Sequence, residues 1–211
     1  MKLIIIGAPG SGKGKLSQFL ASTCAVPHIS SGDIFRKSME LKTPAGLEVA
    51  KYINAGKLVP NELTTMTVLY RLEHKDCEKG FVLDGFPRTV AQAERFEEFS
   101  DIDYVVHLVT EDDTIIRRLA GRRMCRACGG NYNLLWGAFE KCECGGELYG
   151  REDDREETVA ARLKIFHELF TPVLNFYKAR GTKILTVKSD IKESAEDINN
   201  KFMRQFGELF K

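Results

Sequence analysis

A glycine-rich loop, Gly7-Ala8-Pro9-Gly10-Ser11-Gly12-Lys13-Gly14-Lys15, sets the architecture of this chain of 211 residues. It follows a short apolar run, Lys2 to Ile6, and leads into a segment with helical periodicity, Lys13 to Thr23. In this spacing, typical of a P-loop, the glycines let backbone N–H groups surround phosphate oxygens and Lys13 reaches the transferring phosphate. The alternative is an ordinary glycine-rich turn. It is disfavoured because a strand precedes the loop, a helix follows it and a lysine stands at the P-loop position.

Four further short runs, largely apolar, read as strands: His28 to Ser30, Phe81 to Asp84, Tyr104 to Val109 and Lys183 to Val187. Continuous apolar runs are typical of strands buried on both faces of a parallel sheet. Helices are expected over Gly32 to Leu41, Pro44 to Ala55, Asn61 to Lys75, Val90 to Phe99, Asp112 to Arg122, Thr158 to Arg180 and Ser194 to Phe210. The alternation predicts an α/β fold with a doubly wound, five-stranded parallel sheet, whose ligands bind beyond the carboxyl ends of the strands.

Charge and hydropathy exclude several classes of protein. Lys and Arg number 31 against 30 Asp and Glu, so the chain lacks the global positive charge of a general nucleic-acid coat. Its apolar runs are far shorter than the roughly 20 residues that span a bilayer. The start, Met1 to Leu3, leads directly into the first strand, so we expect no signal peptide, no membrane partner and no nucleic-acid partner.

The region Arg123 to Asp154 does not fit the alternation, because it combines glycines, four cysteines and the only tryptophan, Trp136. Its thiols, Cys125, Cys128, Cys142 and Cys144, predict a tetrahedral structural Zn²⁺ site, with iron as the other candidate metal. The Cys-x-Cys spacing of the second pair is the weaker half of this signal, and disulfides or free thiols are the alternatives. We therefore expect a small β-rich subdomain.

Several motifs occur in a recognisable order: Ser30-Ser31-Gly32-Asp33-Ile34-Phe35-Arg36, Gly56-Lys57-Leu58-Val59, Asp84-Gly85-Phe86-Pro87-Arg88, Gly121-Arg122-Arg123, and Arg151-Glu152-Asp153-Asp154 followed by Thr158 to Arg162. In order and spacing the chain resembles adenylate kinases over nearly its whole length, in the long-lid form with cysteines found in many bacteria. The resemblance implies reversible, Mg²⁺-dependent transfer of the terminal phosphoryl group of ATP to AMP, giving two ADP.

The resemblance also implies a division of the chain, a monomer and a cytoplasmic location. The core would comprise residues 1–29 with the P-loop, 60–121 and 159–211. A helical AMP-binding domain would comprise residues 30–59, and a metal-binding lid residues 122–158.

Phosphoryl transfer between nucleotides needs in-line positioning and positive charge in a site closed to water. Arginine suits this chemistry because its planar fork binds phosphate in a bidentate manner. The residues that the resemblance makes catalytic are Lys13, Arg88, Arg122, Arg151 and Arg162. Those implied to bind ATP are Gly10, Ser11, Gly12, Lys13, Gly14, Lys15, Arg118, Arg122, Asn131, Tyr132 and the backbone near Ile191.

The residues implied to bind AMP are Ser31, Arg36, Lys57, Leu58, Val59, Gly85, Phe86, Pro87, Arg88, Gln92, Arg151 and Arg162. The amide of Gln92 would read the adenine edge, with an uninvolved exposed side chain as the alternative. Asp84 would orient the waters of Mg²⁺, unless it is a helix cap or an arginine partner. Lys15 stands where the family usually has threonine, so we expect weaker or altered nucleotide affinity rather than loss of activity.

Two other functions are compatible with parts of the sequence. A UMP/CMP kinase or a GTP-using phosphotransferase would keep the same chemistry, but Gln92 and the cysteine-bearing lid argue against both. A nucleic-acid-binding protein would use the insert as a zinc ribbon and the P-loop as a switch. The insert lacks the interleaved basic and aromatic stripe that such binding needs.

Overall fold

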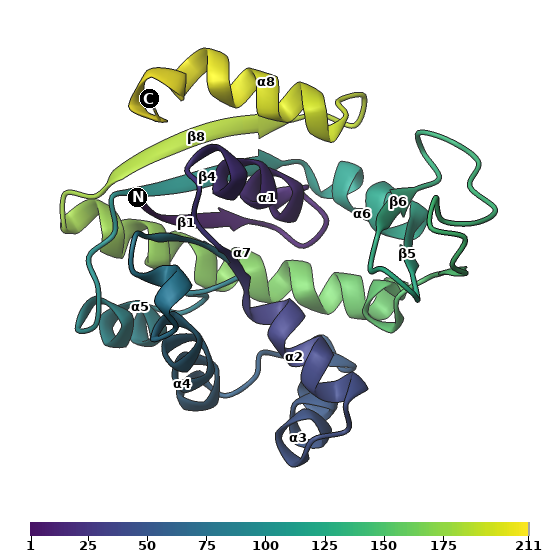
Figure 1. Ribbon diagram of the computed structural model, residues 1–211, viewed down its shortest axis with the longest axis horizontal. Coiled ribbons are helices and arrows are strands. Elements are labelled where there is room, and N and C mark those ends of the chain that lie inside the picture. Colours follow the sequence, from purple (N-terminus) through teal and green to yellow (C-terminus); the bar gives the residue numbers. More distant parts are fainter. Residues whose placement is uncertain (211) are drawn as a thin grey trace.

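The computed structural model describes residues 1–210 and has a five-stranded parallel sheet at its centre (Figure 1). Its strands are β1 (Lys2–Gly7), β2 (His28–Ser30), β3 (Phe81–Asp84), β4 (Tyr104–Thr110) and β8 (Lys183–Ser189). The order is β2-β3-β1-β4-β8, which confirms the predicted doubly wound sheet. After β1 the chain runs to one edge and later crosses to β4 on the other side. The glycine loop therefore begins at the topological switch point, where ligands of such sheets bind.

Alternate residues of the central strand β1 enter two separate cores. Leu3 and Ile5 face α1 (Lys13–Thr23) and α8 (Ala195–Phe206). Ile4, on the other face, packs with side chains from three helices, namely α4 (Asn61–Leu72), α5 (Val90–Glu97) and α7 (Glu156–Ala179). Figure 1 shows α8 and α7 on opposite sides of the sheet. This burial on both faces fixes the carboxyl ends of the strands as a rigid platform.

A helical unit projects from the sheet after β2 (Figure 1). Its helices are α2 (Ser31–Glu40) and α3 (Pro44–Ile53). Their starts are capped by side chains: Ser30 Oγ accepts the Asp33 N–H at 3.2 Å, and the hydroxyl of Thr43 accepts the Gly46 N–H at 3.0 Å. Phe35, Val49 and Val59 form a small core of their own in this unit. It is thus built separately from the two main cores.

The insert leaves the body of the protein at the end of α6 (Asp112–Gly121) and forms a second, antiparallel sheet. Its strands are β5 (Arg122–Cys125), β6 (Asn131–Asn133) and β7 (Leu148–Tyr149), in the order β6-β5-β7. The expected β-rich subdomain is therefore confirmed. Large apolar side chains do not form a core inside this subdomain: Trp136 is 46 % exposed, and Leu134 and Leu135 are exposed to a similar degree. We call residues 122–158 the lid.

Helix ends are the main difference from the sequence-based expectation. The helix expected to reach Lys75 ends at Leu72 and is followed by a 3₁₀ turn, η1 (Lys75–Cys77). Arg71 donates to both carboxylate oxygens of Asp76, which holds that turn against the helix. The last expected helix likewise ends at Phe206, before the turn η3 (Gly207–Phe210), and α7 begins at Glu156 after the turn η2 (Glu152–Asp154). None of the helices within residues 1–210 has the length and apolar composition to cross a membrane.

Candidate active site

The glycine loop wraps the start of α1 and holds Lys13 at the floor of a cleft. Gly10 has a φ of 80°, and a Cβ there would lie 2.7 Å from the Leu119 side chain, so only glycine fits. Burial, together with the positive charge of Arg88, lowers the pKa of Lys13 to about 8 against the opposing attraction of Asp84. The negative charge near Lys13 does not balance the positive charge around it, so an anion that binds beside Lys13 would be stabilised.

Asp84 ends β3 beside this lysine and is 7 % exposed. Burial favours a raised pKa for Asp84, but the His28 imidazole and the charge of Lys13 outweigh it, so the pKa lies below its usual value. His28 Nε2 is 3.6 Å from Asp84 Oδ2, just beyond hydrogen-bond distance. A Cβ on Gly14 would stand 3.3 Å from the same oxygen. The carboxylate is thus charged and unobstructed, which fits a water-mediated Mg²⁺ site.

The cleft lies between the glycine loop, the helical unit and α7, and it collects many of the predicted residues. Among those that line it are Lys13, Ser31, Arg36, Lys57, Leu58, Val59, Gly85, Pro87, Arg88, Gln92 and Arg162. The side chain of Phe86 is instead packed in the core, with its ring 5.7 Å from that of Phe96. Residues from five separate motifs therefore share one concave surface.

Hydrogen bonds preset the part of the cleft around Gly85. The Gly85 carbonyl accepts from Arg88 Nε at 2.7 Å and from Ser31 Oγ at 2.8 Å. Gln92 is only 1 % exposed, so it is not the exposed side chain that the alternative assumed. Its Oε1 accepts from the Arg88 backbone N–H at 2.7 Å, and its Nε2 donates to Asn61 Oδ1 at 3.0 Å.

The lid arginines are held by two aspartates in the turn η2. Arg122 Nε donates to Asp154 Oδ2 at 2.7 Å, and Arg151 Nε donates to Asp153 Oδ1 at 2.8 Å. Arg162, on α7, donates to Asp153 Oδ2 at 3.0 Å and to its carbonyl at 2.7 Å. Burial favours a raised pKa for Asp153, but its arginines hold the pKa far below the usual range. Sequence reasoning gave neither aspartate a role, although the Asp153-Asp154 doublet between two arginines was a visible signal.

The five residues predicted to be catalytic are close enough to repel one another. Burial lowers the pKa of Arg162, Asp153 opposes this, and the charges of the neighbouring arginines add to the decrease, so that the pKa is about 10. Lys13 is lowered in the same way by Arg88, Arg162 and Arg122. The glycine loop, the end of β3, the lid and α7 thus direct their cations into one region. A site that concentrates positive charge in this way is suited to a polyphosphate.

Arg118 is buried and links separate segments of the chain. Its guanidinium donates to the Ser11 carbonyl at 3.0 Å, to Ser189 Oγ at 2.9 Å and to the Asp190 carbonyl at 2.5 Å. The glycine loop is thereby joined to the segment after β8 that contains Ile191. The Arg118 Cζ lies 5.6 Å from the centroid of the Trp136 ring, while Asn131 and Tyr132 lie on β6 and Lys15 is exposed on α1.

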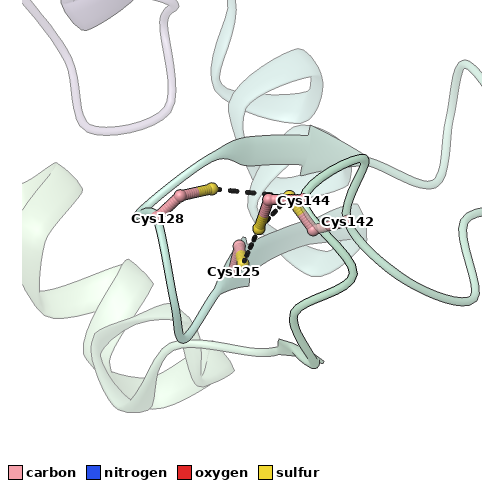
Figure 2. Close-up of side chains that lie close together, drawn as sticks. All are labelled: Cys125, Cys128, Cys142 and Cys144. Atoms are coloured by element: carbon pink, nitrogen blue, oxygen red, sulfur yellow. Dashed lines mark hydrogen bonds between the residues drawn. The ribbon is translucent and has the colours of Figure 1, made fainter.

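The four lid cysteines converge on one point (Figure 2). The Sγ atoms of Cys125 and Cys144 are 3.5 Å apart, those of Cys128 and Cys142 are 3.4 Å apart, and all four lie within 4.8 Å of one another. A tetrahedron of thiolates with Zn–S bonds of about 2.3 Å has edges of roughly 3.8 Å, so the arrangement fits a closed metal site. The separations exceed the S–S bond of about 2 Å, and all four thiols are unpaired, which excludes disulfides.

Tyr132 supports this site from outside the ligand set. Its hydroxyl lies 3.1 Å from Cys142 Sγ and accepts the Glu143 backbone N–H at 3.2 Å. Because that N–H can only donate, the phenol proton is free to point at the sulfur. This hydrogen bond is the main reason why the pKa of Cys142 falls to about 6, which favours the thiolate that a metal needs.

Comparison with known proteins agrees with this geometry. A family model described as adenylate kinase matches residues 5–182. The chain is 44 % identical over 208 residues to the adenylate kinase of Geobacillus sp. (strain WCH70), covering 94 % of this chain and 96 % of the relative. It is 46 % identical over 192 residues to that of Bacillus subtilis, at 86 % and 88 % coverage, and 39 % identical over 208 residues to that of Caldicellulosiruptor bescii, at 94 % and 97 % coverage. The chain belongs to the adenylate kinase family.

Proposed function

We propose that the protein transfers the terminal phosphoryl group of ATP to AMP, reversibly, giving two ADP. The observation that carries the proposal is the convergence of Lys13, Arg88, Arg122, Arg151 and Arg162 on one region beside the cleft. Membership of the adenylate kinase family supports the same reaction.

The reaction needs charge and position rather than proton transfer. A phosphate oxygen of AMP forms a bond to the γ-phosphorus, while the bond from that phosphorus to the β–γ bridging oxygen breaks and leaves its electron pair on ADP. The attacking oxygen is already ionised, and the leaving oxygen departs as an anionic oxygen of the β-phosphate of ADP, so neither a general base nor a general acid is required. Cations around the equatorial oxygens, in a site without water, supply the catalysis.

The lid arginines would act by changing partners. Each of Arg122 and Arg151 holds an aspartate carboxylate with its fork, and a phosphate offers the same two-oxygen edge. We propose that bound phosphates take the forks over from Asp154 and Asp153 as the lid approaches. Arg36 and Arg88 would hold the AMP phosphate, and Lys13 with the glycine loop the phosphates of ATP.

Two metals belong to the proposal. Asp84 would hold Mg²⁺ through water, and the ion would neutralise charge on the phosphate oxygens of the bound nucleotide. Cys125, Cys128, Cys142 and Cys144 would hold a structural Zn²⁺, because four protein ligands leave no open position for substrate.

We also propose that residues 30–59 and 122–158 act as separate units on a core made of residues 1–29, 60–121 and 159–211. The separate small core of Phe35, Val49 and Val59 supports the first unit, and the separate sheet supports the second. A monomer in the cytoplasm completes the proposal, because free thiols suit a reducing compartment. Light scattering at assay concentration would test the monomer.

A coupled assay tests the reaction. With ATP as donor, AMP should be converted far faster than CMP, UMP or GMP, and GTP should replace ATP poorly. Arg122→Met should reduce kcat by about 10²- to 10³-fold. Arg117→Met is the matched control on the preceding helix α6: Arg117 is exposed, and the substitution should leave the rate unchanged. Absence of transfer to AMP in the unmodified protein would overturn the proposal.

A further inference from the structure

The buried amide of Gln92 is held at both of its ends. Its Oε1 accepts the Arg88 backbone N–H at 2.7 Å, and its Nε2 donates to Asn61 Oδ1 at 3.0 Å. Asn61 Oδ1 also accepts from Thr89 Oγ1 at 3.1 Å, and Thr89 Oγ1 accepts the Gln92 backbone N–H at 3.2 Å. The two bonds to Asn61 join the start of α4 to the start of α5 beside the cleft, and the other two lie within the start of α5.

Backbone groups determine which way every side chain in this network faces. The Arg88 N–H can only donate, so the oxygen of Gln92 must face it and the nitrogen must face Asn61. The Thr89 hydroxyl oxygen is taken by another backbone N–H, so its proton is directed to Asn61, which must present its oxygen. Asn61 therefore accepts twice, and its amide cannot turn over without losing both bonds.

A fixed amide distinguishes purines that differ at position 6. Adenine offers an amino donor beside a ring-nitrogen acceptor, whereas hypoxanthine offers a carbonyl acceptor beside an N–H donor. Gln92 has one N–H and one oxygen lone pair left after its two internal bonds. In a given orientation of the Gln92 amide, this N–H and this lone pair match the edge of only one of the two bases. To match the edge of the other base, the amide must turn by 180°.

We propose that Asn61 is a positioning residue that fixes the orientation of Gln92 and thereby makes the acceptor site select a 6-amino purine over a 6-oxo purine. The inference rests on the proposed function, in which the acceptor is AMP. Asn61 itself is exposed at the first turn of α4, so replacing it opens no cavity in either core.

The test compares AMP with inosine monophosphate (IMP) as acceptors in the full-length protein. Asn61→Leu should lower the ratio of kcat/KM for AMP to that for IMP about five- to tenfold, the effect of one neutral hydrogen bond, because the Arg88 bond remains. Asn61→Asp keeps an oxygen that accepts twice and should restore the ratio. Asn175→Leu, the same change at an exposed position of α7, should leave the ratio unchanged.

A double-mutant cycle isolates the effect on Gln92. In a Gln92→Met background, adding Asn61→Leu should change the ratio no further, because the amide that Asn61 orients is gone. Direct calorimetric affinities for AMP and IMP provide a second readout, and Asn61→Ala replaces the leucine variant if the latter misfolds.

The possible outcomes separate the inference from the function beneath it. Absence of AMP phosphorylation in the unmodified protein overturns the proposed function. Normal AMP phosphorylation with an unchanged AMP-to-IMP ratio in Asn61→Leu and Asn61→Ala overturns the role of Asn61 alone. An equal loss for both acceptors means that Asn61 only supports the fold locally, and it also overturns the inference.

Discussion

The parallel sheet and the lid hold cationic side chains beside the same cleft, but by different means. The sheet positions Lys13 and Arg88 from strands whose side chains, such as Leu83, are completely buried. In the lid, the thiols of Cys125 and Cys142 are buried while Leu134 and Trp136 remain open to solvent. Hydrophobic burial fixes the first region, whereas ion pairs and metal-ligand geometry fix the second.

This difference matches what each region has to do. Burial on both faces of a sheet is non-directional and cooperative, so its platform opens only when the whole protein unfolds. The forks of Arg122 and Arg151 on two aspartates are local contacts that a phosphate can replace. A rigid half and an exchangeable half are therefore built into one chain, and they should respond to different perturbations.

Identical substitutions in the two regions should differ most. Leu83→Ala removes a fully buried side chain from the sheet and should lower the free energy of unfolding by about 3 kcal/mol. Leu134→Ala, in the lid, removes a side chain that is 43 % exposed and should change it by less than about 0.5 kcal/mol. Urea unfolding followed by far-UV circular dichroism measures both, and equal losses would refute the contrast.

Metal removal should disrupt the lid and spare the sheet. Freshly purified protein should contain one Zn²⁺ or iron per chain, and a strong chelator should reduce transfer about tenfold or more as the lid loses its ligand cluster. Trp136 is the only tryptophan, so its fluorescence reports on the lid alone, while the far-UV signal should change little. Protein that contains no metal, or that loses its entire far-UV signal with the metal, would contradict this prediction.

Loss of one hydroxyl in the lid should weaken metal binding without removing a ligand. Tyr132→Phe deletes the hydrogen bond to Cys142 and should lower metal affinity about tenfold, as measured by competition with a chromophoric chelator. Tyr149→Phe is the control, because Tyr149 lies on β7 against Arg126. Equal affinities for the two variants would show that the Tyr132 bond contributes nothing.

The smallest effect is expected from pH acting on the sheet side. With a pKa of about 8, Lys13 loses its positive charge as the pH rises through that value. The affinity for ATP should therefore have its full value below pH 7, where Lys13 is protonated, and should fall severalfold by pH 9. Titration calorimetry measures this change. Lys13→Arg should remove this inflection, because guanidinium stays charged. A flat profile in the unmodified protein would argue against a perturbed lysine.

Strands and motif positions were predictable because their signals are local. His28 to Ser30 and Phe81 to Asp84 were predicted to the residue, since turn residues bound each short run. The end of α4 was not, because it depends on the Arg71 fork that binds Asp76 after the helix. The spacing of turn residues shows where an apolar run begins and ends. It does not show which side chain later in the chain will contact the end of a helix.

The candidate site divides in the same way. The sequence indicated a cluster of arginines but not that Asp153 and Asp154 hold them, because that pairing requires the turn η2 to meet α7. Gln92 was predicted to read the base, whereas its hydrogen bond to Asn61 joins two residues that lie 31 positions apart in sequence, on different helices. Pairings across separate elements are properties of the fold, and a single sequence does not display them.

The aspartates of η2 have a consequence for how binding should depend on salt. Asp153 and Asp154 form ion pairs with Arg122, Arg151 and Arg162 and so serve as their counterions. Without a bound nucleotide, these arginines therefore bind few anions from solution. When a nucleotide binds, its phosphates replace the aspartate carboxylates as partners of the arginines, and few ions are released to the solvent. Its affinity should therefore fall less steeply with ionic strength than the number of arginines suggests, and chloride should compete poorly for them.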